Sequence, residues 1–218
     1  MRVLGLETSS RIATVAVCRD GRVLGQAQSD VSGAHAERLM PMVEQALLAA
    51  GLDRSEIDRV GVGVGPGSFT GVRAGLSVAR GIARGLNIPV VGVGSLRALA
   101  HACSPPSAVV AVLDARRDEV FVAAYAPDGG ELVAPRVVAV AAFDAWLAAQ
   151  TLGPHVFVGE GVALLNRASA CSEPDGVLPH AVCVAQVAAA LAPELAPATP
   201  VYVRDAGATP QKLPPSPF

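Results

Sequence analysis

A glycine-rich stretch from Gly65 to Gly85 constrains the fold of this 218-residue chain more than any other feature. It has the form of a loop followed by a helix, and the helical part keeps four glycines, Gly71, Gly75, Gly81 and Gly85. Each interior glycine costs a helix about 1 kcal/mol relative to alanine. Close approach of a neighbouring backbone is the usual compensation, so we expect this helix to press against a neighbour.

The spacing within this helix defines two adjoining apolar stripes. One apolar stripe is enough to face one core, so two favour a helix covered on two sides, by its own sheet and by a second helix or subunit. The alternative, that both stripes serve the core of this chain, stays open. The first stripe, rich in small residues, consists of Gly71, Gly75, Val78, Ile82 and Gly85, and the second of Val72, Leu76, Ala79, Ala83 and Leu86.

Composition limits the class of protein. Hydrophobic residues make up 51% and charged residues 17%, as in globular proteins, and the net charge of -2 gives no general attraction to nucleic acid. No apolar run reaches membrane-spanning length, and the N-terminus is too short and acidic for a signal peptide. The four cysteines show no CxxC spacing, so we expect buried reduced thiols and a cytoplasmic protein.

A repeated order of elements predicts two lobes. Three strands joined by tight turns and followed by a helix begin near residue 1, and the same order begins near residue 108. A duplicated βββα unit predicts a two-lobed α/β protein. A Pro-Pro pair marks the boundary, giving lobes at 1–103 and 108–218, the second ending in a proline-rich tail. The helices expected to matter most for function cover 34–50 and 69–85.

The residues themselves carry no strong catalytic signal. Gly65-Pro66-Gly67 before a helix has the form of a phosphate loop, but it lacks the Walker lysine and the GxGxxG spacing. Ser68 is more simply the N-cap of the glycine helix than a nucleophile. No two histidines lie four residues apart, so we expect neither a metal site nor a catalytic residue in this chain.

Several motifs, in the right order along most of the chain, resemble the TsaB (YeaZ) family of the tRNA threonylcarbamoyladenosine machinery. The most specific is the run Gly-Pro-Gly-Ser-Phe-Thr-Gly-Val-Arg at 65–73, and 35–41, 112–116 and 200–204 fit the same family. The stretch 4–10 resembles the first strand and phosphate loop of the actin-like/sugar-kinase (RNase H-like) superfamily. The resemblance implies the actin-like/sugar-kinase fold. It also implies a protein paralogous to the catalytic subunit TsaD, and the two families were once grouped with M22 glycoproteases.

The resemblance also implies that the catalytic parts are lost. TsaD carries an NHxEGH motif with two histidine metal ligands, and the matching positions here are Ser95 and Leu99. The glycine-rich second phosphate turn is replaced by Asp114-Ala115-Arg116-Arg117. Glu7, Thr8 and Ser9 then form only a degenerate phosphate loop. We expect no cofactor bound tightly by this chain alone, with ATP left as a ligand for the interface with a partner.

The resemblance implies a non-catalytic dimerisation and activating subunit that pairs with TsaD through the helices at 34–50 and 69–85. We expect a TsaE-type ATPase in the full complex and only indirect contact with tRNA; a homodimer of the isolated chain stays open. The expected interface residues are His35, Arg38, Met42, Gln45, Gly71, Gly75, Val78, Ile82 and Gly85. The competing hypothesis is an independent enzyme, an actin-fold ATPase or kinase or an M22-type peptidase.

Overall fold

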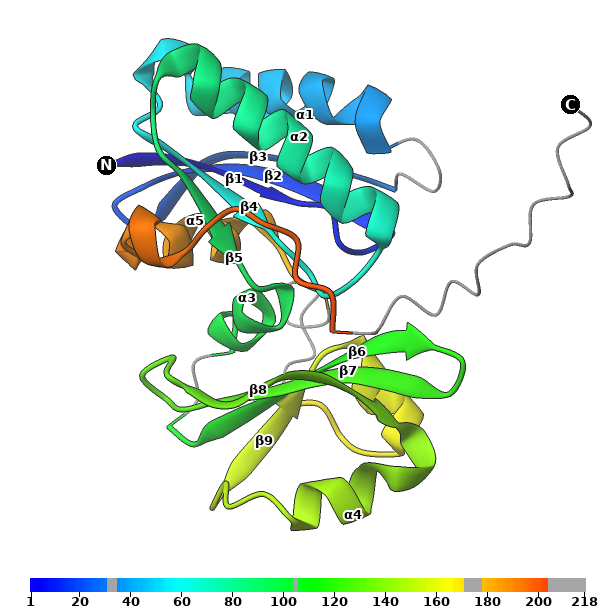
Figure 1. Cartoon of the computed structure of the whole chain (residues 1–218). Helices are drawn as coiled ribbons and strands as arrows, with labels where there is room; N and C mark the ends of the chain where they lie inside the picture. The colour runs from blue at the N-terminus through cyan, green and yellow to red at the C-terminus, as the bar shows by residue number, and fades with distance from the viewer. Residues whose placement is uncertain (31–34, 104–105, 171–177, 204–218) are drawn as a thin grey trace, which may run out of the picture.

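The computed structural model describes residues 1–30, 35–103, 106–170 and 178–203, folded as two lobes (Figure 1). The sheet of the first lobe has the order β3-β2-β1-β4-β5. Its first three strands form an antiparallel meander, and β4 and β5 join β1 in parallel. The strands are β1 (Arg2–Glu7), β2 (Ile12–Arg19), β3 (Arg22–Asp30), β4 (Arg59–Gly63) and β5 (Val90–Val93).

The second lobe repeats this pattern in a smaller sheet of order β8-β7-β6-β9. Again three antiparallel strands come first, and the last strand pairs with the first of them in parallel. The strands are β6 (Ala108–Arg116), β7 (Glu119–Tyr125), β8 (Glu131–Ala139) and β9 (His155–Val158). The predicted two-lobed α/β fold with duplicated βββα units is therefore confirmed, while β9 was not expected.

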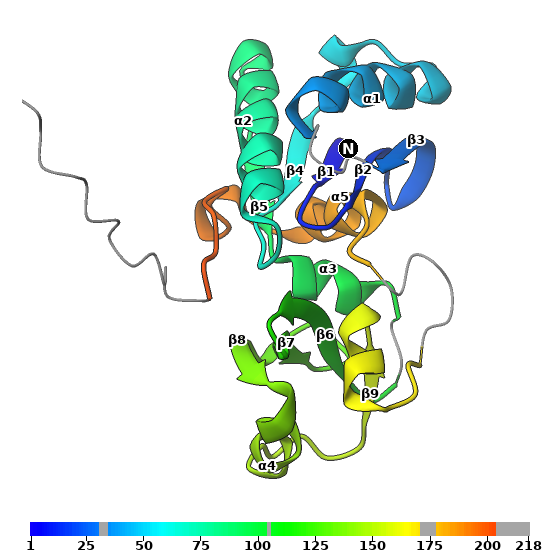
Figure 2. The same ribbon diagram turned by 90° about the vertical axis from the view of Figure 1, so that its right-hand side faces the viewer.

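Helices fill the layers around the two sheets. One face of the first sheet is covered by α1 (His35–Ala50) and α2 (Phe69–Leu86), which contact each other, and the other face by α5 (Ala181–Ala190) (Figures 1 and 2). Between the lobes, α3 (Ser95–His101) packs on β6 and β7 and touches α5. The far side of the second sheet carries α4 (Phe143–Ala148). Short 3-10 helices are η1 (Arg54–Glu56), η2 (Val140–Ala142), η3 (Glu160–Leu165) and η5 (Pro193–Leu195).

The chain returns to the first lobe near its end, which corrects the expected boundaries of 1–103 and 108–218. Helix α5 packs on β1, β2 and β4, and its residues form one buried cluster with Val3, Val91 and Val93. The fit is close because a Cβ on Gly5 would collide with the carbonyl oxygen of Ala181. Glycines in the strands thus let α5 approach the sheet closely. The helix and the strands that it contacts are far apart in the sequence.

A strap formed by residues 192–203 continues this return across the first lobe. The Gly92 N–H donates to the Ala196 carbonyl at 2.9 Å, and the Val201 N–H donates to the Val64 carbonyl at 2.8 Å. The Arg80 guanidinium donates to the Ala198 carbonyl at 2.6 Å. These contacts hold the strap against β4, β5 and α2.

The cysteines only partly match the expectation of reduced thiols. Cys18 and Cys183 are buried thiols. Cys103, after α3, is disulfide-bonded, which corrects the expectation for that residue. Cys171 lies outside the described residues. No helix within the described ranges is both long and apolar enough to cross a membrane.

Candidate functional site

The turn after β1 holds Glu7, Thr8 and Ser9, the residues expected to form a degenerate phosphate loop. All three are buried, with Glu7 and Thr8 fully inaccessible. The Glu7 carboxylate accepts a hydrogen bond from the Ser9 N–H at 2.6 Å and one from the Ser95 hydroxyl at 3.1 Å. Burial raises the pKa of the Glu7 carboxyl, and the hydrogen bonds from Ser9 and Ser95 offset part of that rise. The acidic group is packed inside the protein and leaves little surface for a ligand.

The start of α2 closes over the same turn. The Thr8 hydroxyl donates to the Gly71 carbonyl at 2.8 Å, and the Ser68 N–H donates to the Ser9 carbonyl at 2.6 Å. A Cβ on Gly75 would collide with the Thr8 hydroxyl. Gly71 and Gly75 therefore pack against this chain's own β1–β2 turn, which corrects their expected place in a partner interface. Ser68 is the N-cap of α2, as predicted, accepting from the Gly71 N–H at 3.2 Å.

The positions matched to metal ligands serve the core. Ser95 is fully buried at the start of α3 and donates to Glu7, and Gly94 occupies the N-cap of that helix. Leu99 is fully buried among side chains of β6 and β7. Within the part of the chain that the structure describes, no three His, Cys, Asp or Glu side chains are grouped as metal ligands would be.

The β6–β7 turn, at the matched position of a second phosphate turn, is closed by its own side chain. Asp114 accepts from the Arg116 N–H at 2.6 Å and forms an ion pair with its guanidinium at 3.1 Å. Arg116, Arg117 and Asp118 all have positive φ, so the turn lies two residues later than expected. Burial and the nearby Asp114 charge raise the pKa of the Glu160 carboxyl. The Arg116 guanidinium, paired with Asp114, acts in the opposite direction on the Glu160 pKa, so both signs of charge lie at this turn.

A largely apolar groove of about 480 Å³ lies between α1 and α2. Its floor is the core of the first lobe, and its walls are the facing sides of the two helices. Figure 2 shows these helices above the same face of the sheet. The groove is lined by Leu4, Met40, Val43, Glu44, Leu47, Arg54, Ile57, Val78, Gly81, Ile82, Gly85 and Leu86.

The α2 wall contains the open half of the small-residue stripe. A Cβ on Gly81 or Gly85 would meet no atom within 4 Å, and both glycines are exposed. Val78 and Ile82 are half-buried and pack partly on the core beneath. Three predicted interface residues, Val78, Ile82 and Gly85, thus meet in one groove, and Gly81 joins them. Gly81 is one of the four glycines of this helix, but it was not part of the predicted stripe of small residues.

The α1 wall requires a correction. Met42, expected to anchor a partner, is only 5% exposed and lies in the core with Leu39 and Val43. The buried side of α1 follows positions 39, 42, 43, 46 and 47, the ordinary i, i+3, i+4 spacing of one apolar face. Met40 is 37% exposed and lines the groove, so it takes the place predicted for Met42. Arg38 and Gln45 are exposed, and the side chain of His35 lies outside the described residues.

Comparisons with known proteins agree on one family. Residues 27–209 match the family described as "TsaD: tRNA N6-adenosine threonylcarbamoyltransferase". The chain is 36% identical over 131 residues to the tRNA threonylcarbamoyladenosine biosynthesis protein TsaB of Escherichia coli, an alignment covering 59% of this chain and 56% of that protein. An uncharacterized protein of Mycobacterium tuberculosis is 40% identical over 95% of this chain and 94% of its own length.

Solved structures give the same picture. The structure described as "YeaZ from Pseudomonas aeruginosa" has a TM-score of 0.71 and 32% identity, covering 92% of this chain and 99% of that one. The ethanolamine utilization protein EutJ from Carboxydothermus hydrogenoformans, at 12% identity and a TM-score of 0.51, covers 86% of this chain and 88% of its own and shows the fold alone. The sheet topology and these structures agree on a two-lobed α/β fold shared with the YeaZ structures. The alignment with the curated Escherichia coli TsaB spans little more than half of that protein's length.

Proposed function

Because this chain belongs to the TsaB/YeaZ family, we propose that it serves tRNA threonylcarbamoyladenosine biosynthesis as a non-catalytic subunit. In this proposal it pairs with a TsaD-type catalytic subunit through α1 and α2 and so activates it. The whole role is carried by one surface, the groove between these two helices.

The groove supports the proposal because it leaves apolar surface uncovered beside two helical glycines. Met40 and Ile82 line its walls, and Leu48, also on α1, is 83% exposed. Gly81 and Gly85 offer bare backbone, against which another helix can approach closely. An apolar patch of this kind on a folded domain is typical of a protein contact. A helix pair of a partner would complete a four-helix layer.

The positions that match metal ligands and phosphate turns support a non-catalytic role. Ser95 and Leu99 are committed to the core, and Glu7 is sealed beneath the start of α2. The β6–β7 turn is closed by Asp114. In this proposal, metal-assisted transfer is left to the partner. ATP, a TsaE-type ATPase and tRNA would then bind to the assembled complex, and tRNA would make no direct contact with this chain.

The competing function is an independent enzyme, an actin-fold ATPase or kinase or an M22-type peptidase. One neighbouring structure is described as having "similarity to peptidase YEAZ". No feature of the described site favours this alternative, so it enters as an outcome of the test. The buried Glu7 and Thr8 are its weakest point, since an ATPase needs these positions open to phosphate.

Reconstitution tests the proposal. The purified chain is mixed with the TsaD-type subunit of the same organism, and assembly is followed by size-exclusion chromatography with light scattering. Threonylcarbamoyl transfer to tRNA is then measured with each subunit alone and with both. We expect a stable heteromeric complex, no transfer by this chain alone, and much faster transfer when both subunits are present.

Two results would contradict the proposal. One is the absence of any complex under conditions in which both subunits are folded. The other is metal-dependent transfer, ATP hydrolysis or peptidase activity by this chain alone that tracks with it through a second purification. A homodimer of the isolated chain that dissociates when the TsaD-type subunit is added is consistent with the proposal, since both would use the same groove.

A further inference from the structure

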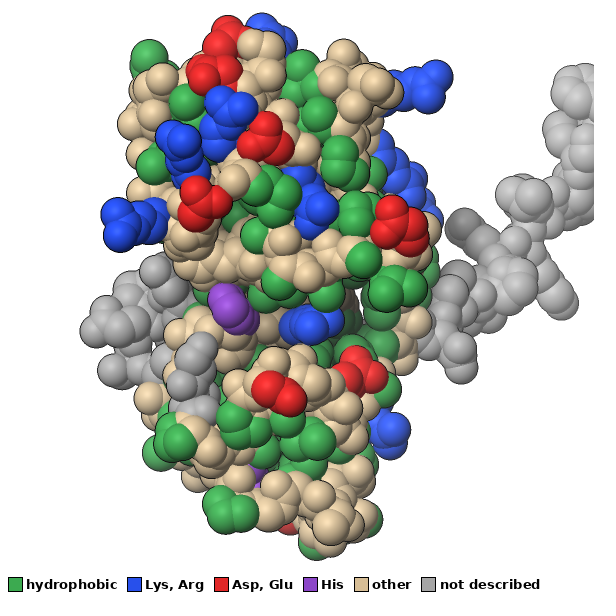
Figure 3. Space-filling model, turned by 90° about the vertical axis from the view of Figure 1, so that its left-hand side faces the viewer, with side chains coloured by type: hydrophobic (Ala, Val, Ile, Leu, Met, Phe, Trp, Pro, Cys, Tyr) green, Lys and Arg blue, Asp and Glu red, His purple; other side chains and the backbone are tan. Residues whose placement is uncertain are grey.

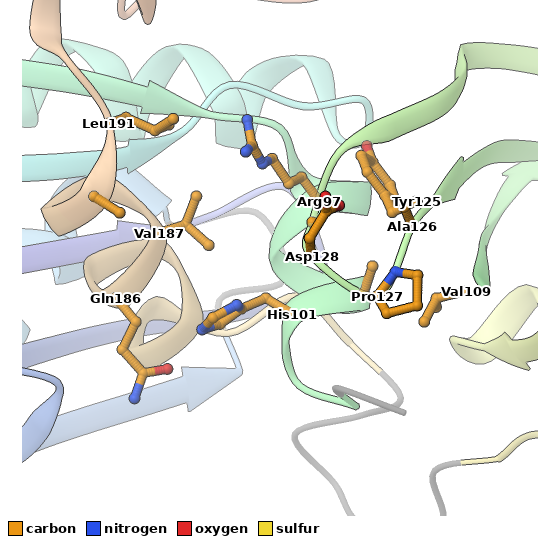
Figure 4. A pocket seen from close by; sticks show the side chains of 13 residues that line it. Arg97, His101, Val109, Tyr125, Ala126, Pro127, Asp128, Gln186, Val187 and Leu191 are labelled. Atoms are coloured by element: carbon orange, nitrogen blue, oxygen red, sulfur yellow. The ribbon is translucent and has the colours of Figure 1, made fainter. Parts of the chain in front are cut away.

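A second pocket, of about 280 Å³, lies at the junction of the lobes and is separate from the groove between α1 and α2. Its walls come from α3, α5 and the turn that joins β7 to β8, so both lobes contribute (Figure 4). The volume is just below the range of about 300–1,000 Å³ typical of small-molecule sites. Figure 3 shows the face of the molecule where the two lobes meet, with a basic side chain in the waist between them.

Arg97 is the charged group of this pocket that lacks a counter-ion. It is half-buried, and Figure 4 shows it extending from α3 into the space between α5 and the β7–β8 turn. Among the residues that the structure describes, no hydrogen bond or ion pair to the Arg97 guanidinium is formed. No Arg97 nitrogen is among the buried side-chain atoms that lack a hydrogen-bond partner, so its N–H groups reach water and are open to an anion that enters the pocket.

Part of the remaining lining is apolar, although Gln186 and His101 also line the pocket. Val187 of α5 and Leu191, which directly follows that helix, lie on one side. The Tyr125 ring lies on the other, and burial raises the pKa of its hydroxyl, which stays protonated and able to donate.

Asp128 is the acidic residue at the exposed rim. Its Oδ1 accepts from the Gly130 N–H at 2.8 Å, so the carboxylate is tied to its own turn. Its charge is exposed to solvent and therefore screened, which leaves Arg97 as the dominant charge deeper in the pocket.

We propose that this junction pocket binds a small organic carboxylate with a short apolar body, anchored by Arg97. The carboxylate would accept two N–H groups of the guanidinium fork, the geometry that arginine offers to planar anions. The apolar body would lie against Val187 and Leu191. Because the pocket is built from both lobes, its occupant would also bridge them.

A matched pair of probes tests the charge requirement. Binding of 3-phenylpropanoate and of the uncharged 3-phenylpropanamide to the full chain is measured by isothermal titration calorimetry at millimolar concentration. We expect the acid to bind at least tenfold more tightly than the amide. Arg97→Met is expected to weaken the acid at least tenfold and leave the amide unchanged, while Arg84→Met, at an exposed arginine of α2, changes neither.

A second variant tests whether the probes bind in this pocket. Ala190 is exposed and lines the pocket, so Ala190→Phe fills the opening with little effect on folding. It is expected to weaken both probes. The proposal is overturned if neither probe binds to the wild type, if acid and amide bind equally, or if Arg97→Met and Ala190→Phe, both folded by circular dichroism, leave the acid affinity unchanged.

Discussion

At the scale of single residues, glycines and one carboxylate decide what the β1–β2 turn can hold. Glu7 fills the space beside Gly63, where a Cβ would collide with the carboxylate. The absence of a side chain at Gly75 likewise leaves room for the Thr8 hydroxyl. The sequence predicts that the glycines of α2 need a close neighbour, but it does not identify that neighbour. The helical spacing is the same for a contact within the chain and for one across an interface.

Glu7→Gln tests the buried carboxyl. The folded-state pKa is raised above the ordinary value of 4.5, so the native state binds this proton more tightly than the unfolded chain does. The free energy of unfolding therefore falls as the pH rises above about 4.5 toward the raised folded-state value. Glutamine keeps the shape, accepts from the Ser9 N–H and donates to Ser95, and carries no charge.

We expect the Glu7→Gln chain to be more stable than the wild type at pH 7.5 and to depend less on pH. Urea unfolding at pH 5 and pH 7.5 measures both. An equal loss of stability at the two pH values would show that the carboxylate charge is needed where it lies.

A pair of glycine variants separates the two halves of α2. Gly75→Ala places a Cβ against the Thr8 hydroxyl and should lower the free energy of unfolding by 1 kcal/mol or more, on the order of other overpacked sites. Gly81→Ala meets open space and should raise it by about 0.5–1 kcal/mol, the helix preference of alanine. Urea unfolding of the isolated chain checks both signs; a stabilising Gly75→Ala would contradict the assigned packing.

At the scale of elements, α1 shows where periodicity misleads. The prediction placed Met42 with Arg38 and Gln45 on the partner-facing side of α1, yet Met42 is buried together with Leu39 and Ala46. Helical spacing alone does not fix how far the buried face extends around the helix. By contrast, α2 begins directly after its Ser68 cap, as predicted, and ends at Leu86, one residue beyond the predicted 85, because caps are local to the chain.

Met42→Asp and Met40→Asp form a matched test on one helix. Asp at 42 puts an unpaired charge into the core and should destabilise the isolated chain by several kcal/mol. Asp at 40 lies on the groove wall, so the chain should fold nearly as the wild type and lose affinity for the TsaD-type subunit. Thermal unfolding and size-exclusion chromatography of the mixture distinguish them. A stable Met42→Asp chain would contradict the burial of this side chain.

At the scale of the whole molecule, the repeat of strands is readable from the sequence because each hairpin is built from near neighbours. The return of α5 and of the strap 192–203 to the first lobe is not, since those contacts join segments more than a hundred residues apart. The disulfide of Cys103 was not predicted, because the cysteines show no spacing that indicates a pair. For the candidate site, sequence pointed to α1 and α2 and to Val78, Ile82 and Gly85, while Gly81 and Met40 emerged only from the fold.

The central claim, that the groove between α1 and α2 receives the partner subunit, is tested most directly by filling it. Gly85→Leu adds bulk where a Cβ meets nothing, and Ser77→Leu adds the same bulk on an exposed position of α2 outside the groove. The dissociation constant for the TsaD-type subunit is measured by titration calorimetry for the wild type and both variants, after circular dichroism shows that each is folded. We predict that Gly85→Leu weakens binding at least tenfold and Ser77→Leu by less than twofold. Unchanged binding by a folded Gly85→Leu chain would contradict the claim.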